Sequence, residues 1–506
     1  MTLDGSIRAE ATNGTTLCNA FQASPSTAVR PFRLFRPLLH LEALRVVTPP
    51  EDFSRESELL DMQGVSTSWL HPFARIPIIG IVLLLILGQN GSAQTLGPLD
   101  RGRGRDMLHL LRKDMERYYY DSTFRGMNLA PRWAEAEQRI QQASTLEQIL
   151  AAIAQVPIAL GDSHTLFFPP SRTLTAEYGW EMQMIGDTCY VSEVEEASDA
   201  ARQGVKPGDA VLVLNGNRPD RDNIALIRYV LRMLLPQPAL RVLLQSPGGR
   251  RRELTLDAVV KRRPMIMDLT GLDGGRDLSA LLREADKETR KWDDRYVEIG
   301  KDVIVWQMPT FNSGSEPVKR MLGRIRQRTA LVLDLRGNPG GAEKTLLTMI
   351  GGFFAEDTPV AMLRSRTDSS FLVARGSGDD RFAGPLLVLV DGESASAAEI
   401  FARTVQLTKR GTVIGDQTLG AVMRSRGYSH NLGVETLIPF ATSITVSNVV
   451  MPDGASLEGW GVVPDEVVLP TAQDLAAGRD PALARALALA GVLVSPERAG
   501  RMFPRR

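Results

Sequence analysis

The chain contains 506 residues, of which 43% are hydrophobic and 23% are charged. This composition is ordinary for a globular protein and excludes a fibrous or wholly disordered chain. Lys and Arg together number 59, as do Asp and Glu, so no overall positive field attracts nucleic acid or anionic lipid. The two cysteines exclude a disulfide framework and a cysteine-rich zinc site. At roughly 100–200 residues per domain, the length predicts about three domains.

The long apolar run of the chain extends from Ile76 to Leu87. It is shorter than the roughly 20 residues that a membrane-spanning helix needs. Arg75 precedes the run, and Gly91-Ser92-Ala93 places small residues at the −3 and −1 positions of a cleavage site. This order is typical of a secretory signal peptide.

A signal peptide belongs at a chain start, and Met62 supplies one. We therefore expect residues 62–93 to be the signal peptide and residues 1–61 to be an over-called, unstructured start. The alternative is a genuine extension with an internal membrane anchor. Under the first interpretation the mature chain begins at residue 94, is periplasmic or extracellular, and has no integral membrane span. Its one cysteine, Cys189, suits an oxidising compartment because it needs no partner.

Residues 94–172 carry apolar side chains at helical spacing, which predicts an N-terminal helical domain. Ser144 to Glu147 has the spacing of a capping box, so we expect a helix to start at Ser144. Pro157 is expected to end that helix, because proline removes a backbone donor and clashes with the preceding turn.

Residues 173–262 contain short strand-like runs, with a Gly stop and a Pro-Gly turn between residues 200 and 209. This stretch resembles a PDZ domain, in which a strand and a helix form a groove for an extended peptide. Tyr178 to Glu181 departs from the usual Gly-Leu-Gly-Phe pattern of the carboxylate-binding loop. With this departure, the sequence does not decide whether the domain binds a free peptide C-terminus. It is compatible with a peptide that adds to the sheet as a β-strand.

The remaining chain alternates strand and helix patterns. Residues 263–295 are charged and glycine-containing and are expected to be a connector. Residues 296–470 are predicted to form an α/β core, and residues 471–506 a C-terminal helical tail on that core. The runs that predict buried strands of the core are Val303–Trp306, Leu331–Leu335, Leu386–Val390 and Val413–Gly415.

Two strand-to-helix turns of the core could carry chemistry. The segment from Asp391 to Ala402 follows a buried strand and places Ser394 and Ser396 at a helix start, where free N–H groups favour an anion. The alternative is that both serines only cap the helix. Leu333 to Gly341 ends another strand in a Gly pair that can present backbone N–H groups. A nucleotide-binding loop is not expected there, because no Gly-Lys-Ser/Thr follows.

Together with the segments 415–420 and 457–465, these turns resemble the C-terminal processing (tail-specific) serine peptidases. The wider group includes the tricorn core and the interphotoreceptor retinoid-binding protein. The resemblance implies an α/β fold with a crotonase-like ββα peptidase core, an N-terminal helical domain and an inserted PDZ-like domain. It implies a polypeptide substrate and no cofactor. By this resemblance Ser396 matches the nucleophile, and the N–H groups of Ala397 and of Gly340 or Gly341 match the oxyanion hole.

One position departs from the bacterial processing enzymes, which use a Ser–Lys dyad. Ala421 occupies the place of that lysine, and a methyl group cannot accept a proton. The tricorn-like branch instead uses a His preceded by a Ser and oriented by a distant Glu. Ser163-His164 matches that pair, and Glu458 matches the Glu. Imidazole titrates near neutrality, so it suits the role of base.

Other residues compete for the role of base. His430 follows Ser429 and is the competing imidazole, and His164 could instead be a packing residue. Lys409 lies thirteen residues after the nucleophile, about 20 Å along a helix, and is too far away. Glu399 lies about one turn beyond Ser396, and its role is open between catalysis and holding the helix.

The leading hypothesis is therefore an exported serine peptidase that acts on polypeptides. The rival is a catalytically inactive peptide- or ligand-binding member of the same fold, and a third hypothesis is an enzyme that acts on a non-peptide acyl substrate. The isolated histidines predict no metal site. The sequence contains neither a dinucleotide fingerprint nor an aromatic-plus-basic surface pattern. We therefore expect neither a nucleotide nor a nucleic-acid partner.

Overall fold

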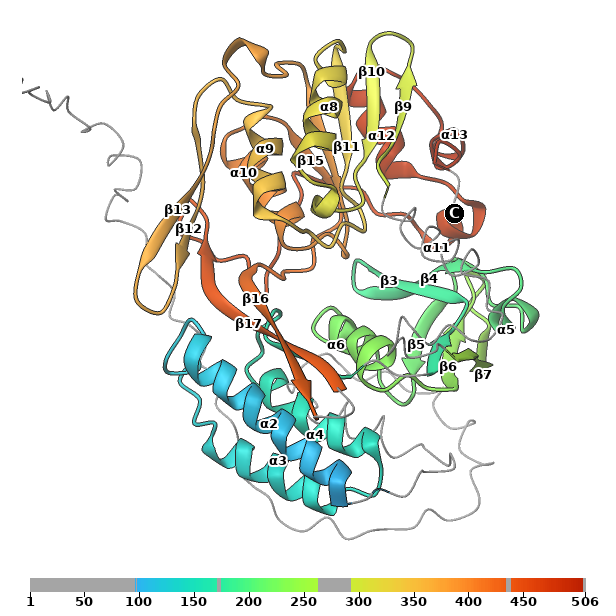
Figure 1. Ribbon diagram of the computed structural model, residues 1–506. Coiled ribbons are helices and arrows are strands. Elements are labelled where there is room, and N and C mark those ends of the chain that lie inside the picture. The colour runs from blue at the N-terminus through green and yellow to red at the C-terminus, as the bar shows by residue number, and fades with distance from the viewer. Residues whose placement is uncertain (1–95, 97, 171–173, 263–292, 434–437, 504–506) are drawn as a thin grey trace, which may run out of the picture. The chain divides into compact units, whose positions relative to one another are not determined.

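The computed structural model describes residues 96, 98–170, 174–262, 293–433 and 438–503 (Figure 1). They all belong to a compact unit that spans residues 76–506. The expected over-called start, the expected signal peptide and nearly all of the expected connector lie outside the described residues. Across the described ranges, no helix combines the length and apolar character that crossing a membrane would require.

Three helices open the described chain: α2 (Pro98–Tyr118), α3 (Ala130–Gln142) and α4 (Leu146–Ile158). Each packs against the other two. Their buried apolar residues recur at helical spacing and form one core, as the sequence pattern predicts.

The predicted bounds of α4 were wrong at both ends. Thr145, not Ser144, is the N-cap residue, and its hydroxyl accepts the backbone N–H of Gln148 at 3.3 Å. The Ser144 N–H donates instead to the side chain of Gln148 at 2.6 Å. Pro157 lies inside the last turn, and the helix runs one residue past it, to Ile158.

The next part of the chain forms a five-stranded antiparallel sheet in the order β3-β4-β5-β6-β7. The strand-like runs that the sequence shows at 189–191, 210–214, 240–244 and 253–256 each lie within one of its strands. The strands are β3 (Trp180–Ile185), β4 (Thr188–Val194), β5 (Ala210–Leu214), β6 (Ala239–Gln245) and β7 (Arg251–Asp257). Two helices, α5 (Asp199–Arg202) and α6 (Ile224–Tyr229), connect them, and α6 continues into the π-helical turn η2 (Val230–Leu234). A separate ribbon pairs β2 (Leu174–Glu177) with β8 (Val259–Arg262).

The core is a six-stranded sheet in the order β18-β15-β14-β11-β10-β9. Its strands are parallel except for the edge strand β9, which is antiparallel to β10. The strands are β9 (Arg295–Ile299), β10 (Val303–Gln307), β11 (Ala330–Asp334), β14 (Leu386–Val390), β15 (Thr412–Gly415) and β18 (Glu466–Val467). All four predicted core strands are therefore present.

Helices cover both faces of this sheet, which is why its central strands β11 and β14 are buried at every position (Figure 1). Alternate residues such as Ile304 and Val388 pack with α8 (Ser315–Ile325), α9 (Glu343–Gly351) and α10 (Ala397–Leu407). The intervening residues, such as Val305 and Leu389, pack with α12 (Pro481–Leu489). The helical tail predicted for 471–506 contains α12 between two short helices, α11 (Ala472–Ala477) and α13 (Pro496–Gly500).

A further sheet, in the order β1-β17-β12-β13, joins the helical segment to the core. Its central strand β17 (Ile438–Val450) pairs with β1 (Leu166–Phe168), β12 (Thr358–Arg364) and β16 (Met423–Leu432), while β13 (Ser369–Ala374) pairs with β12. Helix α2 also packs on β17. Because β1 begins two residues after His164, this pairing fixes where the loop at the end of the helical segment lies.

The packing of α12 predicts a position-dependent cost of truncation. Leu487 is fully buried, so Leu487→Ala is expected to lower the free energy of unfolding by about 2–5 kcal/mol, because the change leaves a cavity. Leu489 on the same helix is 39% exposed, and Leu489→Ala is expected to change it by less than about 0.5 kcal/mol. Urea unfolding of both variants measures the difference. Equal midpoints would contradict the packing of α12 on the sheet.

Candidate active site

Ser396 lies at the turn that joins β14 to α10, and its backbone is strained. Its φ of 53° and ψ of −114° form a combination that residues with a side chain rarely adopt and that costs about 1–3 kcal/mol. An ordinary N-cap residue has extended backbone. Ser396 does occupy the N-cap position of α10, as the capping alternative expects, but capping alone does not require this conformation. The strain instead resembles that of a serine presented on a sharp strand-to-helix turn.

The nearby Ser394 has a different environment. It is fully buried, its hydroxyl donates to the Leu335 carbonyl at 2.8 Å, and the same oxygen accepts the Asp391 N–H at 3.0 Å. These bonds hold the turn of residues 391–396 against the end of β11. Because this turn carries Ser396, the predicted nucleophile, we call it the nucleophile turn. Ser396 is only half-buried, so it is the serine of the pair that a substrate can reach.

Glu399 holds the nucleophile turn to the segment that follows β15. The carboxylate is fully buried, and its Oε2 accepts the N–H of Ser396 at 2.9 Å and that of Ala421 at 3.0 Å. Its Oε1 accepts the Gly420 N–H at 2.7 Å and the Thr418 hydroxyl at 2.6 Å. Burial raises the pKa of Glu399 to about 7, although all four donors favour the ionised form. All the bonds of this carboxylate go to the protein itself, which indicates a role in holding the turn.

The Gly pair after β11 lies directly against Ser396. Gly340 has a φ of 93°, and a Cβ at this position would lie 2.7 Å from the Ser396 Cβ and 2.9 Å from the Ala397 nitrogen. The Gly340 N–H donates to Asn338 Oδ1 at 2.8 Å, so it is already engaged. Within the described ranges, the N–H groups of Gly341 and Ala397 form no hydrogen bond. Of the two glycines that the sequence left open, the geometry therefore favours Gly341 as an oxyanion donor.

Ser163, His164 and Glu458 form a continuous hydrogen-bonded chain. The Ser163 hydroxyl lies 2.7 Å from His164 Nδ1 and donates to Glu458 Oε2 at 2.9 Å. The Ser163 N–H donates to Glu458 Oε1, also at 2.9 Å. Burial lowers the pKa of His164 below its ordinary value of 6.5, and burial raises the pKa of Glu458. A neutral imidazole next to a hydroxyl and a carboxylate can accept and return a proton.

Backbone contacts connect this chain to the nucleophile turn. The Ser396 N–H also donates to the Ala421 carbonyl at 3.0 Å, and the next residue, Val422, donates its N–H to Glu458 Oε2 at 2.8 Å. The turn that carries the imidazole and the turn that carries the serine are therefore held by the same two residues, 421 and 422. Among the described residues no hydrogen bond joins the His164 ring to Ser396. In this conformation the Ser396 hydroxyl therefore cannot pass its proton directly to His164.

The other candidate bases lie in different environments. His430 Nε2 is 2.7 Å from Asp114 Oδ2, and the His430 ring stacks on Phe440 with ring centroids 4.9 Å apart. Lys409 is exposed two residues past the end of α10. Ala421 contributes backbone bonds and a methyl group only. Within the described part of the chain, no group of three or more His, Cys, Asp or Glu could hold a metal ion.

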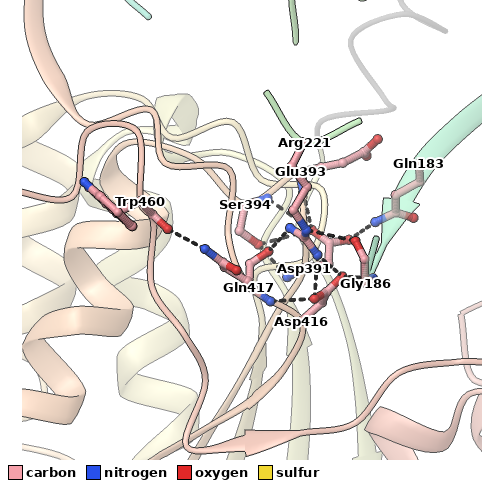
Figure 2. A network of polar contacts seen from close by, with 9 residues as sticks. All are labelled: Gln183, Gly186, Arg221, Asp391, Glu393, Ser394, Asp416, Gln417 and Trp460. Carbon is pink, nitrogen blue, oxygen red and sulfur yellow. Dashed lines mark hydrogen bonds and ion pairs between the residues drawn. The ribbon is translucent and has the colours of Figure 1, made fainter. Parts of the chain in front are cut away.

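Sequence reasoning missed the polar network that ties the five-stranded sheet to the core (Figure 2). Arg221 donates to both carboxylate oxygens of Asp416 at 2.7 Å and to the Gln417 carbonyl at 3.0 Å. Gln183 of β3 donates to Asp391 Oδ2 at 2.6 Å. Asp391 and Asp416 each follow a core strand directly, and this position at a strand end is the signal that the sequence offers.

A small pocket lies between β3 and the α6–η2 helix. Its lining is mainly apolar, with three charged side chains. Arg228 of α6 donates to the Met182 carbonyl of β3 and forms an ion pair with Glu393. The lining residues are Tyr178, Trp180, Glu181, Met182, Arg228, Leu231, Arg232 and Leu240.

Comparison with known proteins finds similar sequences over part of this chain. Residues 302–468 match the model of peptidase family S41. The chain is 31% identical over 171 residues to the tail-specific protease of Haemophilus influenzae, an alignment that covers 33% of this chain and 24% of that protein. It is 26% identical over 296 residues to the carboxy-terminal-processing protease of Bartonella bacilliformis, covering 57% and 60% respectively. The chain thus spans about a quarter of the first relative and 60% of the second.

Among solved structures, mature CPAF is similar in fold, with a TM-score of 0.55 at 15% identity. The match covers 74% of this chain and 94% of that one. The likeness concerns the mixed α/β fold. The family match and the processing-protease relatives support a serine peptidase.

The buried carboxylate of Glu399 predicts a pH-dependent stability. Because its pKa is raised from 4.5 to about 7, its contribution is fully present below pH 4.5 and is lost as the pH rises through 7. The stability of the native chain relative to Glu399→Gln is expected to fall by about 3 kcal/mol between pH 4.5 and pH 8. Urea unfolding of both proteins measures it, with Glu137→Gln on the surface of α3 as control. A difference that stays constant with pH would contradict this expectation.

Proposed function

We propose that this chain is an exported serine peptidase that hydrolyses polypeptides with Ser396 as nucleophile and His164 as base. One observation supports the assignment most directly: the bonded chain from Glu458 through Ser163 to His164 shares its backbone anchor with Ser396. The same contacts support a tricorn-like S41 peptidase that lacks the catalytic lysine. Because the methyl group of Ala421 cannot accept a proton, the imidazole of His164 takes the role of base.

The relay sets the tautomer of the base. Since the Ser163 hydroxyl donates to Glu458, its oxygen accepts the proton on His164 Nδ1, and Nε2 remains free to accept the proton of Ser396. The Ser396 oxygen then forms a bond to the substrate carbonyl carbon. The resulting imidazolium is stabilised through the hydroxyl by the Glu458 carboxylate.

The tetrahedral oxyanion is bound by the N–H groups of Gly341 and Ala397. The C–N bond breaks when His164 Nε2 returns the proton to the leaving amine, and an ester to Ser396 remains. Water then attacks the ester and gives its proton to His164. Release of the acid and return of that proton regenerate the Ser396 hydroxyl.

A polypeptide substrate is supported by the five-stranded sheet and its pocket. An extended peptide can pair with β3, which is an edge strand of this sheet among the described residues, and its side chains can enter the apolar pocket beside α6. This is the arrangement expected of a PDZ-like domain inserted between the helical domain and the core. Arg221 and Gln183 hold it next to the nucleophile turn, where it presents the substrate.

Covalent labelling tests the nucleophile and the base together. A fluorophosphonate probe is expected to label the purified chain 94–506, and Ser396→Ala and His164→Ala are each expected to abolish labelling, because the hydroxyl needs its base. His109→Ala, a change at an exposed histidine on α2, is the control and should retain labelling. Labelling that persists in His164→Ala would eliminate the base assignment. No labelling of the native chain between about pH 6 and 9 would favour the catalytically inactive binding protein.

Export to the periplasm or the extracellular space is supported by the apolar run 76–87 and the small residues before Gln94. N-terminal sequencing of the protein isolated from its own cells is expected to give Gln94 first. Recovery of a peptide from residues 1–61 would instead show a genuine extension.

A further inference from the structure

Asp162 immediately precedes the Ser163-His164 pair and is only 6% exposed. Its Oδ1 accepts the backbone N–H of His164 at 2.8 Å and that of Thr165 at 3.2 Å. The same oxygen accepts the hydroxyl of Thr445 at 2.8 Å, and Oδ2 accepts the hydroxyl of Thr165 at 3.1 Å. The catalytic scheme above uses none of these bonds.

These contacts fix the imidazole turn to β17. The Thr165 hydroxyl oxygen lies 3.1 Å from Thr445 Oγ1 and accepts the Thr445 N–H, also at 3.1 Å. Pairing between β1 and β17 begins directly after this pair of threonines, at Leu166 and Ser443. Asp162 therefore sits where the end of the helical segment meets the sheet that joins it to the core, and it sets the main-chain position of His164.

The charge of Asp162 is uncompensated by any ion pair among the described residues. Tyr119 and Tyr120, which follow α2, and Glu458 across the site interact electrostatically with Asp162, whereas Arg125 interacts with the two tyrosines. Arg125 itself donates to the Leu160 and Gly161 carbonyls rather than to the carboxylate. A buried negative charge next to the imidazole favours its protonated form and opposes the effect of burial.

We propose that Asp162 is a positioning residue of the base: its buried carboxylate locks the imidazole turn onto β17 and supplies a second negative charge, besides that of Glu458, that stabilises the His164 imidazolium. This inference rests on the proposed function. It differs from the Glu458 relay because Asp162 acts through the backbone and through space, with no bond to the ring.

The chain offers a matched control for each half of the test. Asp114 is also a buried aspartate that contacts a histidine, His430, and accepts a β17 hydroxyl, that of Thr442, at 2.6 Å. Asp162→Asn and Asp114→Asn therefore remove equivalent charges from two aspartate–histidine neighbourhoods. Thr445→Val and Thr442→Val remove equivalent hydroxyls from one strand.

The charge is tested by NMR titration of histidine-labelled chain 94–506, which does not depend on activity. Asp162→Asn is expected to lower the pKa of His164 by about half a unit or more, because the carboxylate favours imidazolium. Asp114→Asn is expected to leave the His164 titration unchanged and to move that of His430. A His164 titration that is the same in Asp162→Asn and the native chain would overturn the charge role.

The positioning is tested by the kinetics of fluorophosphonate inactivation. Asp162→Asn is expected to lower the limiting rate of inactivation about tenfold with little change in the half-saturating probe concentration, because the base is displaced and not the binding surface. Thr445→Val keeps the charge and should also lower the limiting rate, whereas Thr442→Val should not. An unchanged rate in Thr445→Val would overturn the positioning role, even where Asp162→Asn does not fold.

Failure of this inference is separable from failure of the proposed function. If the native chain is not labelled at all, the peptidase assignment fails, while the NMR titration still decides whether Asp162 acts on His164. If the native chain is labelled through Ser396 and His164, and the Asp162 and Thr445 variants match it in titration and rate, the peptidase stands and the role of Asp162 is refuted.

Discussion

Two neighbouring backbone N–H groups, those of Ala421 and Val422, donate to two different carboxylates. The first, Glu399, also holds the strained serine turn, and the second, Glu458, also holds the turn that carries the imidazole. Hydrogen bonds to charged groups are each worth about 1.5–3 kcal/mol, and an unpaired buried carboxylate is costly, so neither contact can be lost cheaply. The register of one short backbone segment thereby decides how closely the hydroxyl and its base can approach. Every chemical step proposed for this chain depends on that register.

The proposed base, His164, lies far in sequence from the proposed nucleophile, Ser396. A lysine at position 421 would belong to a residue whose backbone is hydrogen-bonded directly to Ser396. Local structure alone would then place its side chain. An imidazole at position 164 needs the helical segment to be docked, which the structure achieves by inserting β1 beside β17 and by stacking α2 on the same strand. The catalytic competence of such a site is therefore coupled to the stability of a long-range sheet contact. Loss of that contact would separate the base from the hydroxyl without unfolding the α/β core.

The five-stranded sheet contacts the turns after β14 and β15 through polar and charged side chains, and its buried apolar residues share one cluster with the helical segment. Arg221 binds Asp416 after β15, and Gln183 binds Asp391 after β14. Arg228 pairs with Glu393, which lies three residues before Ser396. Ion pairs and single hydrogen bonds can be exchanged for bonds to a peptide at modest cost, whereas a buried apolar interface cannot. The groove beside β3 and the nucleophile turn therefore share side chains, which gives an extended substrate a physical route to both.

The sequence by itself determined the parts of the protein that depend on local pattern. The uniformly apolar runs identified the parallel strands of the core, because strands covered on both faces show no alternation, and the small-residue turns after them located Ser396 and the Gly pair. It did not reveal β16 and β17, whose half-exposed alternation is weaker, or the true N-cap Thr145, since neighbouring Ser and Thr compete for the same donors. Only the tertiary structure decided which glycine keeps a free N–H, which histidine reaches a carboxylate relay, and what the buried carboxylates bind. These outcomes depend on contacts between segments nearly 300 residues apart, such as Ser163 with Glu458, and no periodicity along the chain encodes such a distance.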